Sequence, residues 1–575
     1  GRPVPGDRRA APCERATDGT GEVMEKTRAL GALLVLFALS GCGGGGGGGD
    51  EGDTGLWGPG GAPTTPTTPA PAPTPEVRLV LSTPPIATSL PIGGDVTVAG
   101  QWTATSLGSS QVFLQVSDDG GTFVVPPVAA STSPDFSHVL PLAETVAPGT
   151  TRAGNITVRA CEDVQCVKPY ANASQTLTYT VTITPAQDWE TTQGNAAHNG
   201  YVPITLDATR FAKAWEWKRP GVSMSGTTGA IYHPVTAGRL VFVTANGINS
   251  SGPAVFAINE ADGLVKWTQP FTLSSSGATL NPPAVSEGTV YVPTTGHADT
   301  FLWSFDAADG TPRIKSSFRT QWYDILAPTV SNGIAYLNAG YTTGVVYAFD
   351  RTTGTKTWEA SAGTAGLNTP ALDNANRLYA MNGDSLNILD ARNGTLLGNI
   401  GPISGGMQAD YDGTAIVGAD DSVTALVGER WDDPDARQLR NYAIESKTVR
   451  WTSVKTYRRY PAVAKGVIYA TSNNPLSFDA LDEKTGQLLW SWSPVSSDNG
   501  FIHNVVVTDN LAFVSTTRSL YAIDLATHKP VWQTAEPGYV AISGTRMIYV
   551  MTGVLDDFGW PLGGSDGRLL AYRTR

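Results

Sequence analysis

The sequence predicts an all-β protein in which a small β-sandwich precedes a β-propeller of eight repeated units. Two observations support this fold class. The chain of 575 residues contains 64 glycines and 39 prolines, and only 16% of its residues are charged, which is typical of a turn-rich β protein. In its C-terminal two thirds, one pattern of short apolar strands and turns recurs roughly every 40 to 50 residues.

The N-terminal region carries a targeting signal. Residues 1–23 contain no Met and are rich in Pro, Arg and Gly, so we interpret them as an upstream extension or a misassigned start. From Met24, two basic residues precede an apolar run that ends in Leu-Ser-Gly-Cys at Cys42. This pattern predicts a signal peptide over 24–42. Its ending resembles the lipobox of bacterial lipoproteins, which implies that Cys42 is lipidated and anchors the protein to a membrane.

The residues after Cys42 form a linker rather than a domain. Seven glycines, an acidic patch and a Pro/Thr run occupy residues 43–75, which cannot bury enough apolar surface to fold. By resemblance to Gram-negative sorting rules, Gly43 after the cysteine favours the outer membrane. We therefore expect a protein tethered in the bacterial cell envelope, on the periplasmic or the surface face.

Residues 76–185 alternate apolar and polar side chains in short runs, as in 77–81, 156–160 and 177–181. Runs of this period separated by turns predict an antiparallel sandwich, which resembles an immunoglobulin or fibronectin type III module. Cys161 and Cys166 lie between the last two runs. Because an exported domain meets an oxidising compartment, we expect a disulfide between them. A metal site is the weaker alternative, since no His pair lies nearby.

Residues 186–575 contain the repeat. An acidic or amide residue closes an aromatic-rich strand, Gly follows four positions later, and the next strand ends in a large side chain; the instances are Asn259 to Gly263, Asp306 to Gly310, Asp350 to Gly354, Asp390 to Gly394 and Asp482 to Gly486. Degenerate units surround Glu445 and Asp524, with His528 in the Gly position of the second. Units that open near Pro234, Pro283, Pro328, Pro370, Gln408, Pro461, Asn504 and Ala541 give eight blades.

Aromatic residues and the two ends of the repeat region complete this interpretation. We expect large rings to fill the wedges between neighbouring sheets, namely those of Trp267, Trp358, Trp451, Trp490 and Trp532. The last unit has no room for a fourth strand after Tyr572. Residues 214–217 end in aromatics but lack three preceding strands, so we expect them to complete the last blade and close the ring.

These repeats resemble the PQQ-like, or quinoprotein-type, propeller repeats. The stretch from Gln193 to Gly200 is similar to the segment that often precedes the first blade in that family. A lipid-anchored propeller also resembles the propeller lipoproteins of the outer-membrane barrel-assembly machine. The resemblance implies envelope or outer-membrane proteins as partners, and we expect a monomer. The formal net charge of −12 argues against nucleic acid as a partner, because phosphate binding requires a basic surface.

An enzyme of the same fold is the main competing hypothesis. By resemblance, quinoprotein dehydrogenases use an adjacent Cys pair, a Ca²⁺ ion and a catalytic Asp, whereas residues 186–575 contain no Cys. The six histidines lie in different units and form no HExxH motif: His138, His198, His233, His297, His503 and His528. Of these, we interpret His198 as a structural hydrogen-bonding residue.

Acidic loops at residues 432–435 and 556–557 could bind Ca²⁺, but we interpret them as solvated insertions in preference to metal sites. We therefore expect no catalytic residue, no cofactor and no metal. The sequence favours a non-catalytic protein-binding scaffold. The alternatives are a surface ligand-binding or glycan-binding protein and a PQQ-dependent dehydrogenase.

Overall fold

The computed structural model describes residues 74–575 apart from 109, 144, 220–230, 246–251, 275–277, 297, 320–326, 340–343, 363–368, 383–384, 402–413, 420, 429–436, 496, 554–566 and 575. The predicted signal peptide, Cys42 and nearly all of the linker lie outside the described residues. Among the residues that are described, no helix is long and apolar enough to cross a membrane.

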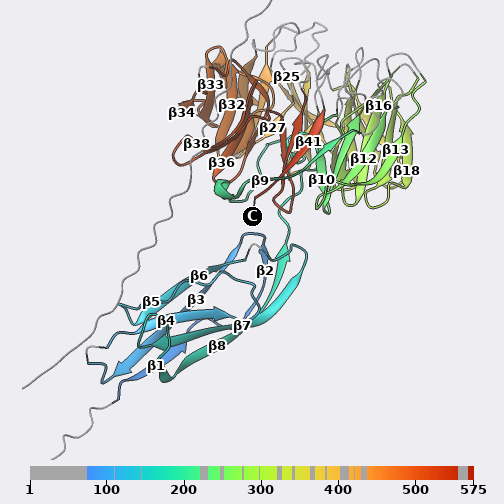
Figure 1. Ribbon diagram of the computed structural model, residues 1–575. Helices are drawn as coiled ribbons and strands as arrows, with labels where there is room; N and C mark the ends of the chain where they lie inside the picture. Colours follow the sequence, from blue (N-terminus) through green and yellow to red (C-terminus); the bar gives the residue numbers. More distant parts are fainter. Residues whose placement is uncertain are drawn as a thin grey trace, which may run out of the picture. The chain divides into compact units, whose positions relative to one another are not determined.

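Residues 76–184 form two sheets around a shared apolar core (Figure 1). The first sheet has the order β1-β3-β6, with β1 (Glu76–Leu81), β3 (Asp95–Thr105) and β6 (Asp135–Pro141). The second has the order β2-β8-β7-β4-β5, with β2 (Ile86–Pro91), β8 (Pro169–Thr184), β7 (Thr151–Cys161), β4 (Phe113–Asp118) and β5 (Ala129–Ala130). Buried and exposed residues alternate along most of β8, as the sequence pattern indicates. The immunoglobulin-like identity of this part stays a prediction.

A disulfide joins Cys161, at the end of β7, to Cys166 in the turn before β8. The side chain of Asp163 holds the same turn, because its carboxylate accepts hydrogen bonds from the backbone N–H groups of Gln165, Val167 and Lys168. Those hydrogen bonds lower the pKa of Asp163 below its usual range. The turn therefore has a second, non-covalent support.

Reducing this disulfide should loosen the β7–β8 turn and leave the propeller folded. The bridge closes a short loop, so we expect its loss to cost about 2 kcal/mol of unfolding free energy. Hydrogen exchange of the amides in β7 and β8 should rise on reduction, with a Cys161→Ser/Cys166→Ser double variant as the unreducible reference. Faster exchange across the propeller sheets would contradict this local effect.

After residue 186, the described strands form eight sheets, called sheets 1 to 8 here. They are sheet 1, β10 (Val235–Ala237), β11 (Leu240–Ala245), β12 (Ala254–Asn259), β13 (Val265–Pro270); sheet 2, β14 (Thr279–Leu280), β15 (Ala284–Ser286), β16 (Thr289–Thr295), β17 (Phe301–Asp306), β18 (Pro312–Ser317); sheet 3, β19 (Thr329–Ser331), β20 (Ile334–Ala339), β21 (Val345–Asp350), β22 (Lys356–Ala360); sheet 4, β23 (Ala371–Leu372), β24 (Arg377–Asn382), β25 (Ser385–Asp390), β26 (Leu396–Ile400).

The remaining four are sheet 5, β27 (Ile416–Val417), β28 (Ser422–Val427), β29 (Gln438–Ala443), β30 (Thr448–Thr456); sheet 6, β31 (Ala462–Ala464), β32 (Val467–Asn473), β33 (Leu476–Asp482), β34 (Leu488–Trp492); sheet 7, β35 (Phe501–Val507), β36 (Leu511–Thr516), β37 (Leu520–Asp524), β38 (Lys529–Thr534); and sheet 8, β39 (Tyr539–Ile542), β40 (Ile548–Thr552), β41 (Arg568–Arg573) with β9 (Ala212–Lys218). A short 3-10 helix, η1 (Ala208–Arg210), precedes β9.

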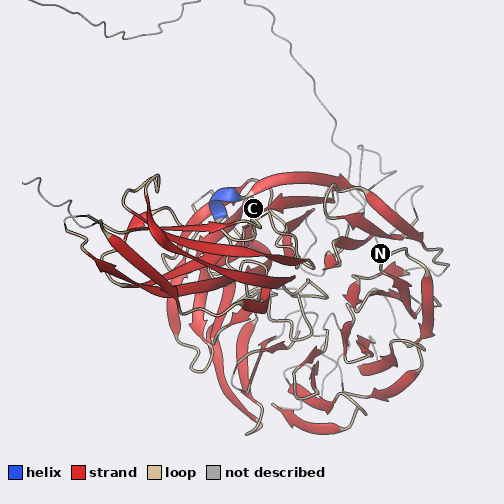
Figure 2. Cartoon of the chain, turned by 90° about the horizontal axis from the view of Figure 1, so that it is seen from below, coloured by secondary structure: helices blue, strands red, loops and turns tan. Residues whose placement is uncertain are grey.

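The sheets follow one another around a ring (Figures 1 and 2). First strands of successive sheets contact each other from sheet 1 to sheet 8. Sheets 8 and 1 share one apolar core, in which the rings of Trp217 and Phe256 lie 5.2 Å apart. This arrangement confirms the predicted all-β propeller.

Sheet 8 is completed from the far end of the repeat region. β9 pairs antiparallel with β41, so that Trp217 lies opposite Leu569 and Ala212 opposite Arg573. The expected closure by residues 214–217 is therefore confirmed. Because β9 covers the outer side of β41, sheet 8 has four strands like its neighbours.

Four of the eight pairs of neighbouring sheets meet at a junction between a tryptophan and a glycine turn. The indole N–H of Trp267 in β13 donates to the carbonyl of Ala307 in sheet 2, at 3.0 Å. A Cβ on Gly310 would lie 2.7 Å from the same indole, so this turn requires glycine. The same pairs occur at three other junctions: Trp215 with Gly263, Trp358 with Gly394, and Trp451 with Gly486.

At the four other junctions, a different residue takes the place of the tryptophan or of the turn glycine. Ile314 replaces the tryptophan beside Gly354, and Lys447 fills the space above Gly398. In sheet 7, His528 takes the turn position with φ of 59° and stacks on Trp490 at 4.4 Å. At the closure, Trp532 meets Tyr572 edge to face at 5.3 Å. The predicted wedge-filling role of the tryptophans is therefore confirmed. The sequence analysis identified His528 as a substitute for glycine but not the roles of Ile314 and Lys447.

Replacing Trp358 with Ala should destabilise the propeller by roughly 3 kcal/mol, because a half-buried ring and its hydrogen bond to Ala391 are lost. Denaturant unfolding measures the change. Glu359→Ala, on the same strand but exposed and paired only with Lys356, should cost less than about 1 kcal/mol. If the two variants lost the same free energy of unfolding, the contact of Trp358 with the next sheet would not stabilise the propeller.

The ring has two different rims. Strands alternate in direction within each sheet, so the connections from first to second and from third to fourth strands share one rim. These connections are short, for example residues 465–466 in sheet 6, and we call this side the tight-turn rim. The other strand ends, where second strands lead to third strands and where one sheet leads to the next, lie at the opposite rim, which we call the long-loop rim because several of its connections contain more residues.

Candidate functional site

The centre of the ring is occupied by the chain itself. Residues 186–202, called the hub segment here, hydrogen-bond to every one of the eight sheets. The N–H of Val285 in β15, for example, donates to the carbonyl of Glu190 at 2.7 Å. The N–H of Val463 in β31 donates to Asn199 at 2.8 Å. The segment therefore fills the place where the first strands converge.

Two side chains of the hub segment reach several sheets each. The Gln193 amide donates to the carbonyls of Pro461 and Val505, at 3.1 and 3.2 Å, and accepts from Asn504. His198 is fully buried, with Nδ1 2.6 Å from the carbonyl of Thr192 and Nε2 2.9 Å from the hydroxyl of Thr329. Burial lowers the pKa of His198, so the ring is neutral at physiological pH. These contacts give His198 the structural role that its sequence context predicts.

An aromatic cluster lies at the long-loop end of the hub. The ring of His233, which precedes sheet 1, stacks on Tyr539 of sheet 8 with centroids 3.9 Å apart. Tyr460, which precedes sheet 6, meets the His233 ring edge to face at 5.7 Å. The guanidinium of Arg459 lies over the Tyr460 ring. Side chains from three sheets thus meet across the channel.

Burial and neighbouring cationic groups shift the acid–base behaviour at this end. Burial holds the pKa of His233 at about 3, and His503 and Arg459 add to the effect. Burial likewise holds the pKa of His503 at about 4, with help from Arg458 and Arg459. Both histidines are therefore neutral at pH 7.

The tight-turn end of the hub is acidic instead. Asp188 accepts hydrogen bonds from the N–H groups of Gly238 and Gly544, which lie in first turns of sheets 1 and 8. Burial raises the pKa of Glu190 to about 7, and repulsion from Asp188 and Glu287 contributes. Carboxyl groups therefore lie at one end of the hub segment, whereas neutral histidines and the guanidinium groups of Arg458 and Arg459 lie at the other.

The histidines are less isolated than the sequence suggests. His233 and His503 come from units far apart in the chain, yet His503 contributes to the lowered pKa of His233 because sheets 7 and 1 flank the closure in sheet 8. Only the ring closure brings them together, so no local spacing could have indicated it. Among the described residues, no group of three or more His, Cys, Asp or Glu side chains could hold a metal ion. His297 and the acidic loops at 432–435 and 556–557 lie outside the described residues.

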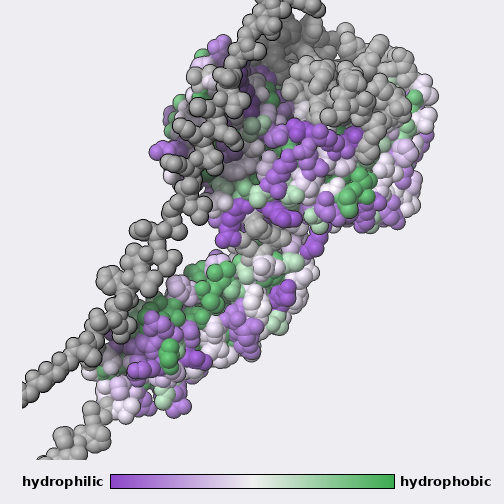
Figure 3. All heavy atoms as spheres, in the orientation of Figure 1, coloured by the Kyte–Doolittle hydropathy of each residue, from purple (hydrophilic) through white to green (hydrophobic). Residues whose placement is uncertain are grey.

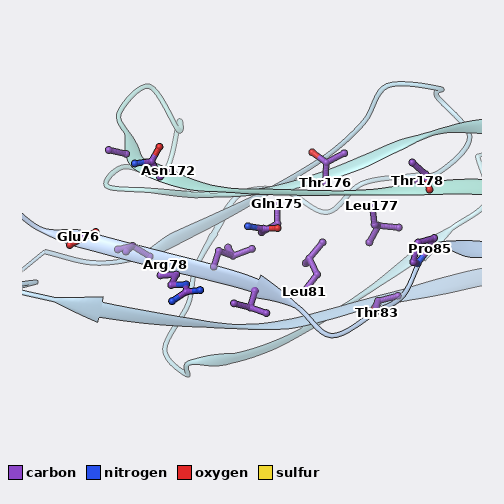
Figure 4. Close-up of a pocket in the computed structure, with 14 residues that line it drawn as sticks. Glu76, Arg78, Leu81, Thr83, Pro85, Asn172, Gln175, Thr176, Leu177 and Thr178 are labelled. Carbon is purple, nitrogen blue, oxygen red and sulfur yellow. The ribbon is translucent and has the colours of Figure 1, made fainter.

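A groove of about 700 Å³ runs between β1 and β8 of the sandwich (Figure 4). Gln175 and Leu177 point from β8 toward β1, and Arg78 lies on the β1 side. No aromatic side chain is among its lining residues, whereas a glycan-binding surface would favour an aromatic platform. The residues that line the groove therefore do not indicate which ligand it would bind.

Aliphatic side chains on the outer strands are also exposed, and hydrophobic residues are visible on the surface in Figure 3. Leu396 and Leu488, the first residues of β26 and β34, are 56% and 57% exposed, and Leu264, which directly precedes β13, is 64% exposed. Singly exposed aliphatic side chains are common on protein surfaces and do not by themselves define a binding site. The hub remains the most organised cluster of polar and ionisable groups.

Repeated four-stranded sheets, tryptophan junctions and a strand exchanged between the ends define this chain as a β-propeller of homologous units. A family model described as outer membrane protein assembly factor BamB (PQQ_2) matches residues 198–322, 313–491, 386–536 and 477–574. Together these matches span about two thirds of the chain. The chain therefore belongs to the PQQ_2 family of BamB-type propellers, and the predicted resemblance is confirmed.

The chain also matches solved structures at low sequence identity. BamB from Moraxella catarrhalis is 12% identical with a TM-score of 0.45, and the match covers 63% of this chain and 99% of that one. KlHsv2 with loop 6CD replaced by a Gly-Ser linker is 9% identical with a TM-score of 0.36, covering 53% and 99%. The Dos1 propeller is 12% identical with a TM-score of 0.35, covering 50% and 88%. No curated protein matches the sequence.

Proposed function

We propose that this protein is a non-catalytic, lipid-anchored scaffold of the bacterial cell envelope that binds other envelope proteins. The family to which it belongs carries the description of an outer-membrane protein assembly factor, and we extend that role to this chain. The lipobox sequence supports an anchor at Cys42, and the linker at residues 43–75 would let the folded part stand away from the membrane.

The observation that carries the proposal is the difference between the two rims. The tight-turn rim consists of short turns held by their own Asp and Gly residues, as at Asp482 and Gly486. Successive sheets are connected on the long-loop rim, and several of its connections contain more residues, such as residues 493–500 between sheets 6 and 7. Such neighbouring loops on a rigid scaffold suit the binding of a protein segment.

The filled hub supports the non-catalytic part of the proposal. A planar cofactor placed at the centre of the ring would have to displace the stacked rings of His233 and Tyr539. It would also compete with the hub segment, whose backbone already bonds to the first strands. The chain thus uses this central position for its own packing.

Matched charge reversals on the two rims test the proposal. Arg518 is exposed in the β36–β37 connection on the long-loop rim, whereas Lys484 is exposed in a tight turn on the other rim. In membranes treated with a cross-linker, Arg518→Glu should reduce the recovery of envelope proteins with the full chain at least threefold, and Lys484→Glu should not. Both variants should keep the parent's melting temperature, since both side chains are exposed.

Two outcomes would overturn the proposal. Equal recovery of envelope proteins with both variants would show that the long-loop rim does not bind them. Calcium-dependent reduction of an electron acceptor by the purified protein supplied with PQQ would show that it is an enzyme. If a Cys42→Ser variant still incorporated labelled fatty acid, lipidation at Cys42 would be wrong, but the proposed binding role would not be affected.

A further inference from the structure

The hub segment visits the sheets in the order in which they stand around the ring. Its first contact is the N–H of Ala186, which donates to Gly544 in sheet 8 at 2.9 Å. The next three contacts are with sheets 1, 2 and 3, through Trp189, Glu190 and Thr191. The last four are with sheets 4, 5, 6 and 7, through the carbonyls of Ala196, Ala197, Asn199 and Gly200. The segment therefore makes one circuit of the channel.

These contacts satisfy backbone groups that the sheets leave open. The first strand of each sheet pairs with the second on one side only, so its other edge faces the channel. A buried N–H without a partner costs about 1–3 kcal/mol. Hub carbonyls accept from six such groups at 2.7–2.9 Å, namely the N–H groups of Thr236, Val285, Leu372, Val417, Val463 and Val507.

The spacing of the hub segment matches the number of sheets. Four sheets in succession are served within five residues, from Ala196 to Gly200. A ring with one sheet fewer would leave a hub carbonyl without its donor, and a ring with one more would leave a first strand without its acceptor. Side chains then connect distant parts of the circuit, because Gln193 bonds to sheets 6 and 7 whereas His198 bonds to sheets 3 and 4.

The local sequence permits this tight path. Gly200 has φ of +63°, and a Cβ there would lie 2.9 Å from the carbonyl of Val505 and 2.7 Å from Nε2 of Gln193. Only glycine fits this conformation and this contact. The requirement explains why glycine ends the motif from Gln193 to Gly200.

We infer that the hub segment is an internal template, which sets the number of sheets at eight and makes them open together rather than one by one. Contacts between neighbours alone would let an opened sheet affect mainly the sheets beside it, as in other repeat proteins. The hub segment adds one element that all eight sheets share. Loss of that element at any point therefore weakens the inner edge of the whole ring.

Native-state hydrogen exchange of the intact full-length protein tests this directly. The six first-strand amides that donate to the hub segment should exchange at rates within about threefold of one another in mild denaturant, since one opening event exposes them all. Rates that fall into separate groups by sheet, more than about tenfold apart, would overturn the inference.

A pair of glycine variants provides a second measurement. Gly200→Ala disturbs the hub beside sheets 6 and 7, and Gly310→Ala disturbs the junction between sheets 1 and 2 by a clash of similar size. The first should raise exchange at Leu372 in sheet 4 as much as at Val507 in sheet 7, by at least tenfold. The second should raise exchange mainly in sheets 1 and 2. If both variants raised hydrogen exchange only in the sheets beside the substitution, the inference would be overturned. If Gly200→Ala does not fold, the exchange rates of the unaltered protein test the inference instead.

Discussion

Replacing β9 with a flexible Gly/Ser stretch of the same seven residues should unfold or aggregate the propeller. The replacement removes Trp217, which is 6% exposed, and Trp215, whose indole bonds to Glu260 in sheet 1. Each ring contributes roughly 3 kcal/mol, so the pair alone approaches the whole stability of a typical domain. Size-exclusion chromatography and thermal unfolding of the purified variant measure the outcome.

The control for this experiment keeps the strand and changes only its exposed charges. A Lys213→Ala/Lys218→Ala variant loses surface ion pairs with Glu216 but retains both tryptophans and the pairing with β41. It should remain monomeric and lose less than about 1 kcal/mol. A Gly/Ser variant that stays monomeric and melts like the parent would refute closure by β9.

In a Glu190→Gln variant, lowering the pH from 8 to 5 should strongly reduce the free energy of unfolding of the propeller. The pKa values of His233 and His503 in the folded protein are about 3 and 4, below the usual value of about 6.5. Below pH 6.5 the unfolded chain therefore binds protons that the folded chain does not, and stability present above pH 6.5 is lost as the pH falls. At pH 5, each of the two histidines should have lowered the free energy of unfolding by roughly 2 kcal/mol relative to its value above pH 6.5.

Glu190 acts in the opposite sense, which is why it must be replaced. Its pKa in the folded protein is raised to about 7, so protonation near that pH relieves a buried charge and stabilises the fold in acid. Glu190→Gln should lose roughly 4 kcal/mol of unfolding free energy between pH 8 and pH 5, and the parent should lose less. Urea unfolding at the two pH values tests this. If the free energy of unfolding of Glu190→Gln were the same at pH 8 and pH 5, the pKa values of the two histidines would not be lowered in the folded protein.

The sequence predicted those parts of the fold that depend on short-range spacing. Asn259 and Gly263 belong to one turn, and the period of such turns predicts the propeller. Its closure was inferred from the incomplete units at the two ends of the repeat region, not from short-range spacing. Cys161 and Cys166 are likewise close in sequence, and whether the exported protein carries this bridge stays a prediction. Lipidation of Cys42 also remains untested, since that residue lies outside the described part.

The arrangement of the hub could not be predicted in the same way. Gln193 was identified only as part of a segment that precedes the first blade, whereas its partners include Asn504 and Tyr539, more than 300 residues away. The proximity of His233 to His503 arises in the same way, because it depends on the closed ring. No periodic signal encodes contacts of this range. The fifth unit, which the sequence opens near Gln408, has its first described strand at Ile416.

The junctions between sheets constrain how such a repeat can diverge. All but one of the junctions take one residue from the fourth strand of a sheet and one from a turn of the next sheet, and at the remaining junction Trp532 meets Tyr572 of strand β41. The two halves of a contact therefore lie in different copies of the repeat. Where the first half has changed to Gly398, the second half has become Lys447, and where the turn has become His528, the ring beneath it has remained Trp490. Duplication of a single blade would therefore copy two half-junctions. Compensating substitutions should therefore accumulate in pairs across blade boundaries.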